Sequence, residues 1–157
     1  MKIIVVADTD KDFERYNNVV QKNDAYCYIH LGDGAHEFAD VAKLNPKKEF
    51  VFVKGDCDFC QASASQVLKI GKYKLFLTHG HLFDVSRGLH KLVAAAKDEE
   101  CDIALFGHTH VYRTEYVDGV YLMNPGSLGC PRGRNKPSYG IIEINDEGAV
   151  KMNIVAY

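Results

Sequence analysis

Short apolar runs that each stop at polar residues constrain the fold of this chain most. Five such runs, rich in β-branched and aromatic side chains, occupy residues 2–7, 26–31, 50–53, 73–78 and 102–106. Runs of this length and composition predict buried strands. They are followed by Asp8-Thr9-Asp10, Gly32-Asp33-Gly34, Gly55-Asp56-Cys57-Asp58, His79-Gly80-His81 and Gly107-His108-Thr109-His110. Residues able to bind metal therefore recur at five predicted strand ends of one sheet system.

Helical spacing of apolar residues alternates with these strands in the first half of the chain. It predicts helices over about residues 11–22 and 35–44, and a third over about 86–100. Such alternation favours parallel βαβ units. Turns at Gly71, Asp118-Gly119 and Asp146-Glu147-Gly148 predict antiparallel hairpins later on. We therefore expect one α/β domain over residues 1–157, with two packed mixed sheets and outer helices: a four-layer α/β/β/α sandwich.

Composition excludes several classes of protein. The formal net charge is −2, so no overall basic field favours nucleic acid as a partner. The apolar N-terminal run is too short for a signal-peptide core or a membrane helix. Five cysteines, an odd number, favour reduced thiols over a disulfide framework. We expect a cytoplasmic protein without membrane partners.

The histidine pairs give the strongest chemical signal. In a strand-like backbone His108 and His110 would point to the same side, with Thr109 facing away. Taken singly, each motif has a plain alternative: a helix cap at Asp8-Thr9-Asp10, turns at the glycine–aspartate pairs, or surface histidines. Four of the seven histidines, however, lie in two His-x-His motifs. Because the mixed Asp and His ligands are too many for one tetrahedral ion, we predict two metals.

The ordered set of motifs resembles the calcineurin-like metallophosphoesterases, most closely their small single-domain bacterial and archaeal phosphodiesterase branch. The resemblance extends to Asn124-Pro125-Gly126-Ser127 and Pro137-Ser138-Tyr139-Gly140, and thus over nearly the whole chain. It implies the four-layer sandwich and two divalent ions. By position, one ion would be held by Asp8, Asp10, Asp33 and His110. The other would be held by Asp33, Asp56, His79 and His108, with Asp33 as the bridge.

The resemblance also implies a metal-dependent phosphoesterase, with a phosphodiesterase favoured over a monoesterase. Two divalent ions about 4 Å apart would generate a bridging hydroxide that attacks phosphorus in line. Besides the ligands, the candidate catalytic residues are Cys57, Asp58 and His81. Cys57 stands where many members have a histidine that protonates the leaving group, His81 is the alternative donor, and Asp58 is expected to orient its neighbours.

Two departures from the family pattern change the charge of the expected site. The first motif usually reads Asp-x-His, and here its third residue is Asp10; the third motif usually has Asn, and here it is Asp56. Four carboxylates, two divalent ions and a hydroxide leave about one net negative charge by formal counting. The additional hard oxygen ligands favour Mn²⁺ or Mg²⁺ over Zn²⁺, with Ni²⁺ and Fe²⁺ as further options. We therefore predict a manganese-preferring enzyme of modest activity.

The remaining features leave alternatives open. Arg132 and Arg134 lie in a late basic loop and either capture a small phosphoester substrate or are simply solvated. The Cys57-x-x-Cys60 pair could be a redox dithiol. A non-catalytic, metal-binding scaffold of the same fold, similar to the retromer scaffold subunit of eukaryotes, is the alternative to an enzyme. A homo-oligomer is one option for the assembly.

Overall fold

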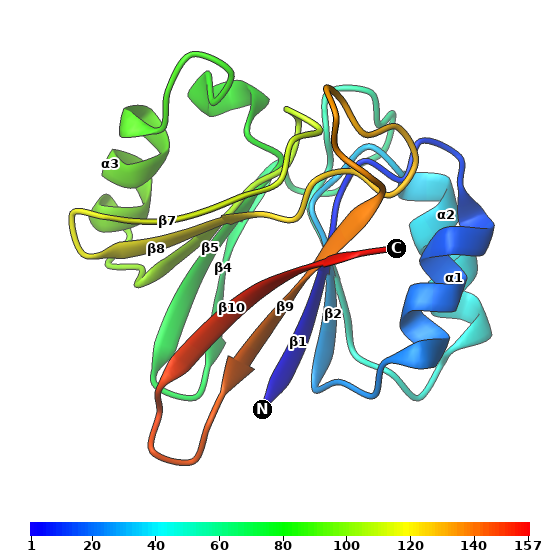
Figure 1. The fold of residues 1–157 in the computed structure, drawn as a ribbon, viewed down its shortest axis with the longest axis horizontal. Helices are drawn as coiled ribbons and strands as arrows, with labels where there is room; N and C mark the ends of the chain where they lie inside the picture. The colour runs from blue at the N-terminus through cyan, green and yellow to red at the C-terminus, as the bar shows by residue number, and fades with distance from the viewer.

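The computed structural model describes residues 1–157 and consists of ten strands, three α-helices and one 3₁₀ turn (Figure 1). The strands are β1 Lys2–Val6, β2 Cys27–His30, β3 Phe50–Phe52, β4 Ser65–Ile70, β5 Tyr73–Thr78, β6 Ile103–Leu105, β7 Arg113–Val117, β8 Val120–Asn124, β9 Ser138–Ile144 and β10 Val150–Ala156. The helices are α1 Phe13–Lys22, α2 Ala35–Leu44 and α3 His90–Asp98, and the 3₁₀ turn is η1 His81–Phe83. None of the helices combines the length and the apolar character needed to cross a membrane.

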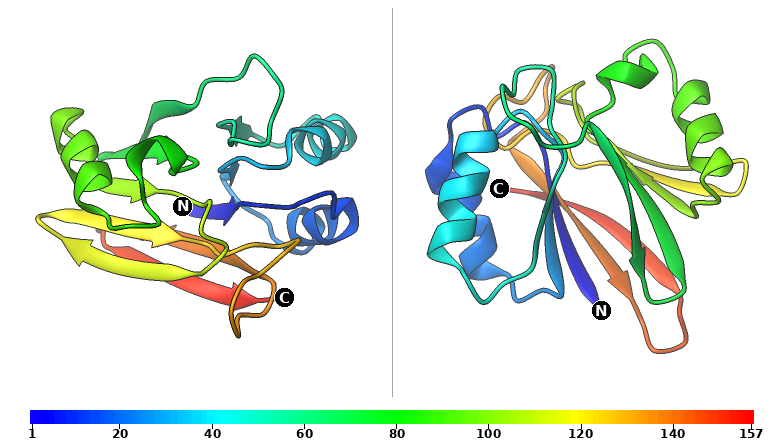
Figure 2. Two further views of the ribbon diagram at one scale, coloured as in Figure 1. Left: turned by 90° about the horizontal axis from the view of Figure 1, so that it is seen from above. Right: turned by 180° about the vertical axis from the view of Figure 1, so that it is seen from behind.

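Two five-stranded mixed sheets form the centre of the molecule. The first has the strand order β10-β9-β1-β2-β3, in which β1, β2 and β3 are parallel and the C-terminal hairpin β9–β10 joins β1 antiparallel. The second has the order β4-β5-β6-β8-β7, in which β5, β6 and β8 are parallel. Helices α1 and α2 cover one outer face and α3 covers the other (Figures 1 and 2). The predicted four-layer α/β/β/α architecture is confirmed.

The alternation of apolar side chains along each strand explains the layers. On β1, Ile3 and Val5 point into the core between the sheets, whereas Ile4 and Val6 pack under α1 and α2. On β6, Ile103 and Leu105 face the same central core, and the residue between them packs under α3. Since successive strand residues point to opposite faces, a strand buried on both sides must be apolar throughout. The continuous apolar runs of the sequence therefore correspond to the central strands.

Helix boundaries differ from the sequence prediction at two places. Helix α1 begins at Phe13 instead of residue 11, because Asp10 and Lys11 have left-handed φ angles of 46° and 72° and Asp12 caps the first turn by accepting the Arg15 N–H. Helix α3 is shorter than the predicted 86–100. The turn η1, which the sequence pattern did not predict, follows β5 directly.

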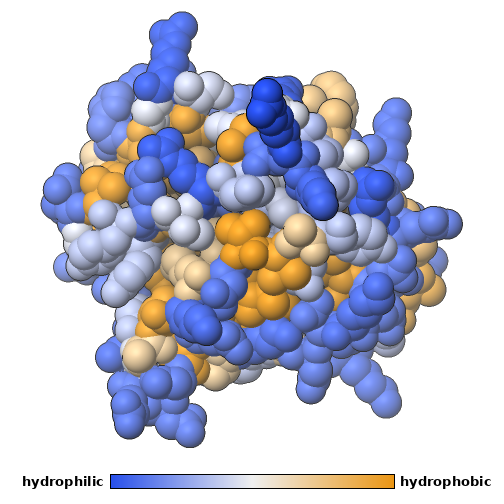
Figure 3. All heavy atoms as spheres, in the orientation of Figure 1, coloured by the Kyte–Doolittle hydropathy of each residue, from blue (hydrophilic) through white to orange (hydrophobic).

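The polar loops gather at one end of the sandwich. The segments that follow β1, β2, β3, β5 and β6 all lie at the upper end in Figure 1, although these strands belong to two different sheets. The face seen in this orientation is mostly hydrophilic, with a hydrophobic area near its middle, where β10 runs across the front (Figure 3). The candidate site thus lies where the carboxyl ends of the two sheets meet.

Candidate metal site

His79 lies at the centre of the polar cluster. Its Nε2 atom is 3.0 Å from Asp56 Oδ1, 3.4 Å from Asp33 Oδ2 and 3.7 Å from Asp8 Oδ1. Its side chain is fully buried. The structure therefore brings three predicted ligands from the first sheet to one histidine at the end of β5 in the second sheet.

His108 and His110 contact opposite sides of this cluster. His108 Nδ1 is 3.2 Å from Asp56 Oδ1, whereas His110 Nε2 is 3.2 Å from Asp8 Oδ1 and its Nδ1 is 3.8 Å from Asp10 Oδ2. All seven predicted ligands are thereby brought together. The groups Asp56–His79–His108 and Asp8–Asp33–His79 each have ligand atoms within 4.8 Å of one another. His79 thus joins the two predicted ligand sets instead of belonging to one alone.

The backbone of the His108–His110 turn differs from the expected strand-like form. Both residues have left-handed φ angles, 69° for His108 and 60° for His110. The prediction of a strand-like backbone was wrong, but Thr109 does face away and accepts a hydrogen bond from Asn124 Nδ2 at 3.0 Å. The same Asn124 amide donates to the Gly107 carbonyl at 2.9 Å. A buried asparagine at the end of β8 therefore holds this turn.

Backbone carbonyls orient two of the imidazoles. His79 Nδ1 lies 2.7 Å from the Leu31 carbonyl oxygen, and His110 Nδ1 lies 2.6 Å from that of Cys130. A carbonyl can only accept, so Nδ1 carries the proton in both rings. The Nε2 lone pair of each neutral ring is then directed at the cluster, which is the arrangement found around metal-bound histidines.

Two buried atoms of the cluster have no hydrogen-bond partner: Asp8 Oδ1 and His79 Nε2. The other oxygen of Asp8 accepts the His108 N–H at 3.1 Å, so the carboxylate is fixed with Oδ1 directed at the two histidines. An unpaired buried polar atom costs about 1–3 kcal/mol. A divalent cation would satisfy both atoms, and the residues present therefore fit a metal ion.

Without a cation, protons on histidine partly compensate the carboxylates. Burial disfavours the charged form of His79, yet the neighbouring carboxylates of Asp33 and Asp8 raise its pKa to about 9. The Asp8 carboxylate, 3.2 Å from His110 Nε2, likewise raises the pKa of His110 to about 9. Burial alone would raise the pKa of Asp33, but His79 and the Cys57 N–H hold it well below its usual value.

The two carboxylates that depart from the family pattern are the more exposed ligands. The Asp56 side chain is 40% exposed and that of Asp10 is 34% exposed, whereas Asp8 is fully buried. Burial, opposed by His110, raises the pKa of Asp10, and the charges of Asp8, Asp33 and Glu37 raise it further. These two carboxylates lie at the solvent side of the cluster.

Asp58 and Cys57 contact the cluster in different ways. Both oxygens of Asp58 accept backbone N–H groups, from Asp33 and Gly55 at one oxygen and from Gly34 and Ala35 at the other. Cys57 is exposed and forms a candidate ligand group with Asp33 and Asp56. The Asp33 charge raises the pKa of the Cys57 thiol to about 11, so the thiol is protonated at neutral pH.

His81 lies beside the cluster but is not one of the residues that contact its carboxylates. Its ring centre is 5.5 Å from that of His79 and 6.1 Å from that of His108. Burial, together with the charge of His79, lowers the pKa of His81. A neutral imidazole near pH 7 suits a proton acceptor better than a donor.

The two arginines line different cavities. Arg132 lines a cavity of about 320 Å³ with Thr109, Phe106 and Ser86, and its backbone N–H donates to the His110 carbonyl at 3.1 Å. Arg134 lines a separate cavity with Tyr112 and Lys136. Only Arg132 therefore adjoins the turn that carries the candidate ligands.

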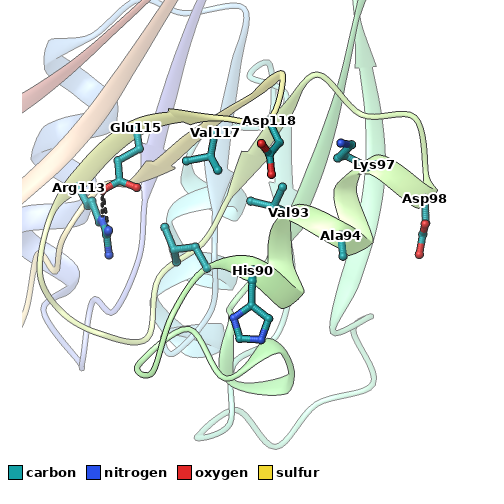
Figure 4. Close-up of a pocket in the computed structure, with 10 residues that line it drawn as sticks. His90, Val93, Ala94, Lys97, Asp98, Arg113, Glu115, Val117 and Asp118 are labelled. Carbon is teal, nitrogen blue, oxygen red and sulfur yellow. Dashed lines mark hydrogen bonds and ion pairs between the residues drawn. The ribbon is translucent and has the colours of Figure 1, made fainter.

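A larger cavity, about 560 Å³, lies away from the cluster, between α3 and β7 (Figure 4). Its apolar floor includes Val93 and Val117, and Arg113 pairs with Glu115 at its edge. None of the seven candidate ligands lines it. A search for the functional site by cavity size alone would therefore miss the cluster of candidate ligands.

A carboxylate–imidazole cluster at the junction of two sheets, with unpaired buried ligand atoms, defines a metal-binding hydrolase-type site. The chain belongs to the calcineurin-like phosphoesterase superfamily, since the sequence profile of that superfamily domain matches residues 1–147. The suspected family is confirmed, and the candidate ligand groups agree with a family that uses divalent metal ions.

Three proteins illustrate the range of this similarity. The crystal structure of a predicted phosphoesterase from Streptococcus pneumoniae TIGR4 is 29% identical, has a TM-score of 0.87, and covers 99% of this chain and 88% of that chain. Phosphodiesterase YfcE of Escherichia coli is 32% identical over 112 residues, which are 66% of this chain and 57% of that protein. A single mutant of Vps29 from Entamoeba histolytica is 26% identical with a TM-score of 0.79, covering 100% of this chain and 99% of that chain.

Proposed function

We propose that the protein is a dinuclear metal-dependent phosphoesterase that hydrolyses a phosphodiester. The unpaired, buried pair of Asp8 Oδ1 and His79 Nε2 at the centre of the ligand cluster carries this proposal. The similarity to YfcE, a phosphodiesterase, supports a diester over a monoester as substrate.

The ions would be held at the ends of the cluster. One end of the cluster, towards α1, consists of His110, Asp8 and Asp10. The other end consists of His108 and Asp56. Asp33 and His79 lie between them. Two divalent ions bound there would activate a water molecule and neutralise charge on the phosphoryl oxygens.

The protein's own residues then provide orientation and a proton. Asp58 ties the loop of Asp33 to the loop of Asp56 through its four backbone hydrogen bonds. The Cys57 thiol, protonated at neutral pH, is the proposed proton donor to the leaving oxygen. His81 is better suited to accept a hydrogen bond from substrate or water.

The function is tested with the full chain, first freed of metal and then loaded with Mn²⁺, Mg²⁺, Ni²⁺, Fe²⁺ or Zn²⁺. We expect two ions per chain and hydrolysis of bis(4-nitrophenyl) phosphate that is fastest with Mn²⁺, because oxygen ligands outnumber nitrogen ligands. Absence of hydrolysis with every metal would refute the proposed phosphoesterase activity.

The role of Cys57 is tested with two leaving groups. Replacing Cys57 by alanine should slow hydrolysis of an alkyl phosphodiester, whose leaving oxygen needs a proton, by about 10²-fold or more. It should change hydrolysis of the nitrophenyl ester little, since nitrophenolate leaves unprotonated. Equal losses on both substrates would contradict a donor role.

The role of the two unusual carboxylates is tested by restoring the family pattern. Asp10→His and Asp56→Asn each remove a negative charge, so we expect faster hydrolysis of an anionic diester and a weaker preference for Mn²⁺ over Zn²⁺. The charge argument fails if neither substitution changes turnover or metal preference.

A non-catalytic scaffold is the second candidate. The similarity to Vps29 along the whole chain favours it, as do the carboxylates Asp10 and Asp56, which make the site less receptive to anions. Under this alternative the metal-loaded protein would hydrolyse no aryl diester with any of the five metals.

A further inference from the structure

Glu37 is a buried carboxylate that lies outside the seven candidate ligands. It belongs to the first turn of α2 and is only 7% exposed. No lysine, arginine or histidine lies within ion-pair distance of it. A buried charge without a counter-charge costs several kcal/mol, so its position requires a specific explanation.

The hydrogen bonds of Glu37 go to the turn that carries Asp8 and Asp10. Its Oε1 atom accepts the backbone N–H of Lys11 and lies 3.3 Å from Thr9 Oγ1. Glu37 therefore contacts the residue between the two aspartates and the residue directly after them.

A buried histidine fixes the direction of these bonds. His30 Nδ1 accepts the Gly32 N–H at 3.1 Å, so the ring proton is on Nε2 and is donated to Thr9 Oγ1 at 3.1 Å. Burial lowers the pKa of His30 to about 3, which keeps the ring neutral. The Thr9 hydroxyl proton is then free to be donated to Glu37.

The turn held in this way has an unusual backbone. Asp8, Asp10 and Lys11 all have left-handed φ angles, of 51°, 46° and 72°. Such conformations in residues other than glycine cost about 1–3 kcal/mol each and persist only where surrounding contacts hold them. The Lys11 N–H bond to Glu37 is one of these contacts.

The close approach of α2 also depends on Gly34. A Cβ atom at this position would lie 1.9 Å from Thr9 Oγ1 and 2.7 Å from His30 Nε2. Only glycine therefore allows the start of α2 to come near enough for Glu37 to reach the turn.

We propose that Glu37 is a positioning residue for the cation site formed by Asp8, Asp10 and His110. It holds the Asp8–Lys11 turn through Thr9 and Lys11, and its charge adds to the attraction for a divalent ion. This inference rests on the metal binding within the proposed function but not on hydrolysis.

The experiment measures Mn²⁺ binding to the metal-free full chain by isothermal titration calorimetry. Replacing Glu37 by alanine removes the acceptor and the charge, so we expect one of the two sites to lose about tenfold or more in affinity and the other to change little. Replacing Glu37 by glutamine keeps an acceptor and should cause a smaller loss. Asp40→Ala, an exposed change on the same helix, is the matched control and should leave both affinities unchanged.

A double-mutant cycle with Asp10→Ala separates positioning from general damage. If Glu37 acts through Asp10, then Glu37→Ala causes no further loss of Mn²⁺ affinity once Asp10 is alanine. Thermal unfolding gives a second readout: the rise in melting temperature that Mn²⁺ causes should be smaller in Glu37→Ala than in the wild type. A purely structural residue would lower both melting temperatures, with and without Mn²⁺, equally, which would overturn the proposal.

The two proposals fail in different ways. Two-site Mn²⁺ binding without hydrolysis would refute the enzyme and leave the role of Glu37 intact. Unchanged affinity at both sites in Glu37→Ala, with hydrolysis retained, would overturn the role of Glu37 alone. If the alanine variant does not fold, the Mn²⁺ affinities of Glu37→Gln are measured instead. Unchanged affinity at both sites of that variant overturns the proposal.

Discussion

Replacing Asp58 by asparagine would disturb four backbone hydrogen bonds at once. Asp58 Oδ2 accepts the N–H groups of Asp33 at 2.7 Å and Gly55 at 2.8 Å, while Oδ1 accepts those of Gly34 at 3.0 Å and Ala35 at 2.9 Å. An asparagine has one carbonyl oxygen, and its NH₂ group would face two N–H donors.

The size of the effect follows from these two lost acceptors. A hydrogen bond to a charged group contributes about 1.5–3 kcal/mol, and water reaches part of this half-buried side chain, so we expect a loss of about 2–4 kcal/mol. Burial alone would raise the pKa of Asp58, but the four N–H groups hold it below its usual value of 3.8. A lowered carboxyl pKa stabilises the fold above pH 3.8 and loses this contribution as the pH falls through the folded-state value. Measurements at pH 7 therefore capture the whole effect.

Urea unfolding of the metal-free protein at pH 7 is the assay. Asp12→Asn is the matched control, because Asp12 caps α1 through a single N–H, asparagine caps equally well, and the partly exposed ion pair of Asp12 with Arg15 contributes little. We expect a change of about 0.5 kcal/mol or less for the control. An Asp58→Asn variant within about 0.5 kcal/mol of the wild type, at unchanged urea dependence, would refute the reasoning.

Three further predictions concern protons, charge and packing. Since the pKa values of His79 and His110 are raised to about 9, their contribution to the stability of the metal-free protein is complete below about pH 6.5 and is lost as the pH rises through 9. Mn²⁺ binding at pH 7 should accordingly release about two protons, measured by calorimetry in buffers of different ionisation enthalpy, and zero release would contradict the assignment. Arg132→Gln should raise KM for an anionic diester by about tenfold, whereas Arg134→Gln should not, and an unchanged KM in Arg132→Gln would place Arg132 outside the substrate site. Gly34→Ala should destabilise the protein by about 1–3 kcal/mol in urea unfolding, because its Cβ would meet Thr9 Oγ1, and a neutral effect would show that α2 can move.

Local patterns in the sequence predicted much of the fold. The apolar runs predicted the bounds of β1, β2, β5 and β6 to within about two residues. These strands are central, and a strand that is buried on both faces is apolar along most of its length. Glycine turns marked the hairpins β4–β5, β7–β8 and β9–β10. The choice of sheet for each strand could not be predicted in this way, since strand pairing depends on contacts distant in sequence.

Backbone conformation was the main source of error near the site. Lys11 was expected to start a helix, and His108 and His110 to continue a strand, but all three have left-handed φ angles. These angles are maintained by residues far along the chain: Glu37 for the first turn and Asn124 for the second. No local pattern of the sequence marked Glu37 as part of the site, whereas Asn124 belongs to the motif Asn124-Pro125-Gly126-Ser127 that the family resemblance includes.

The sequence by itself determined which residues are able to bind cations and that they follow buried strands, because residue type and strand periodicity are local properties. Only the tertiary structure decided that strand ends from two sheets meet at His79, that Glu37 and Asn124 hold the two turns, and that Arg132 and Arg134 line different cavities. These outcomes depend on packing between segments 17 or more residues apart, where the energy of each contact depends on the surrounding residues in three dimensions.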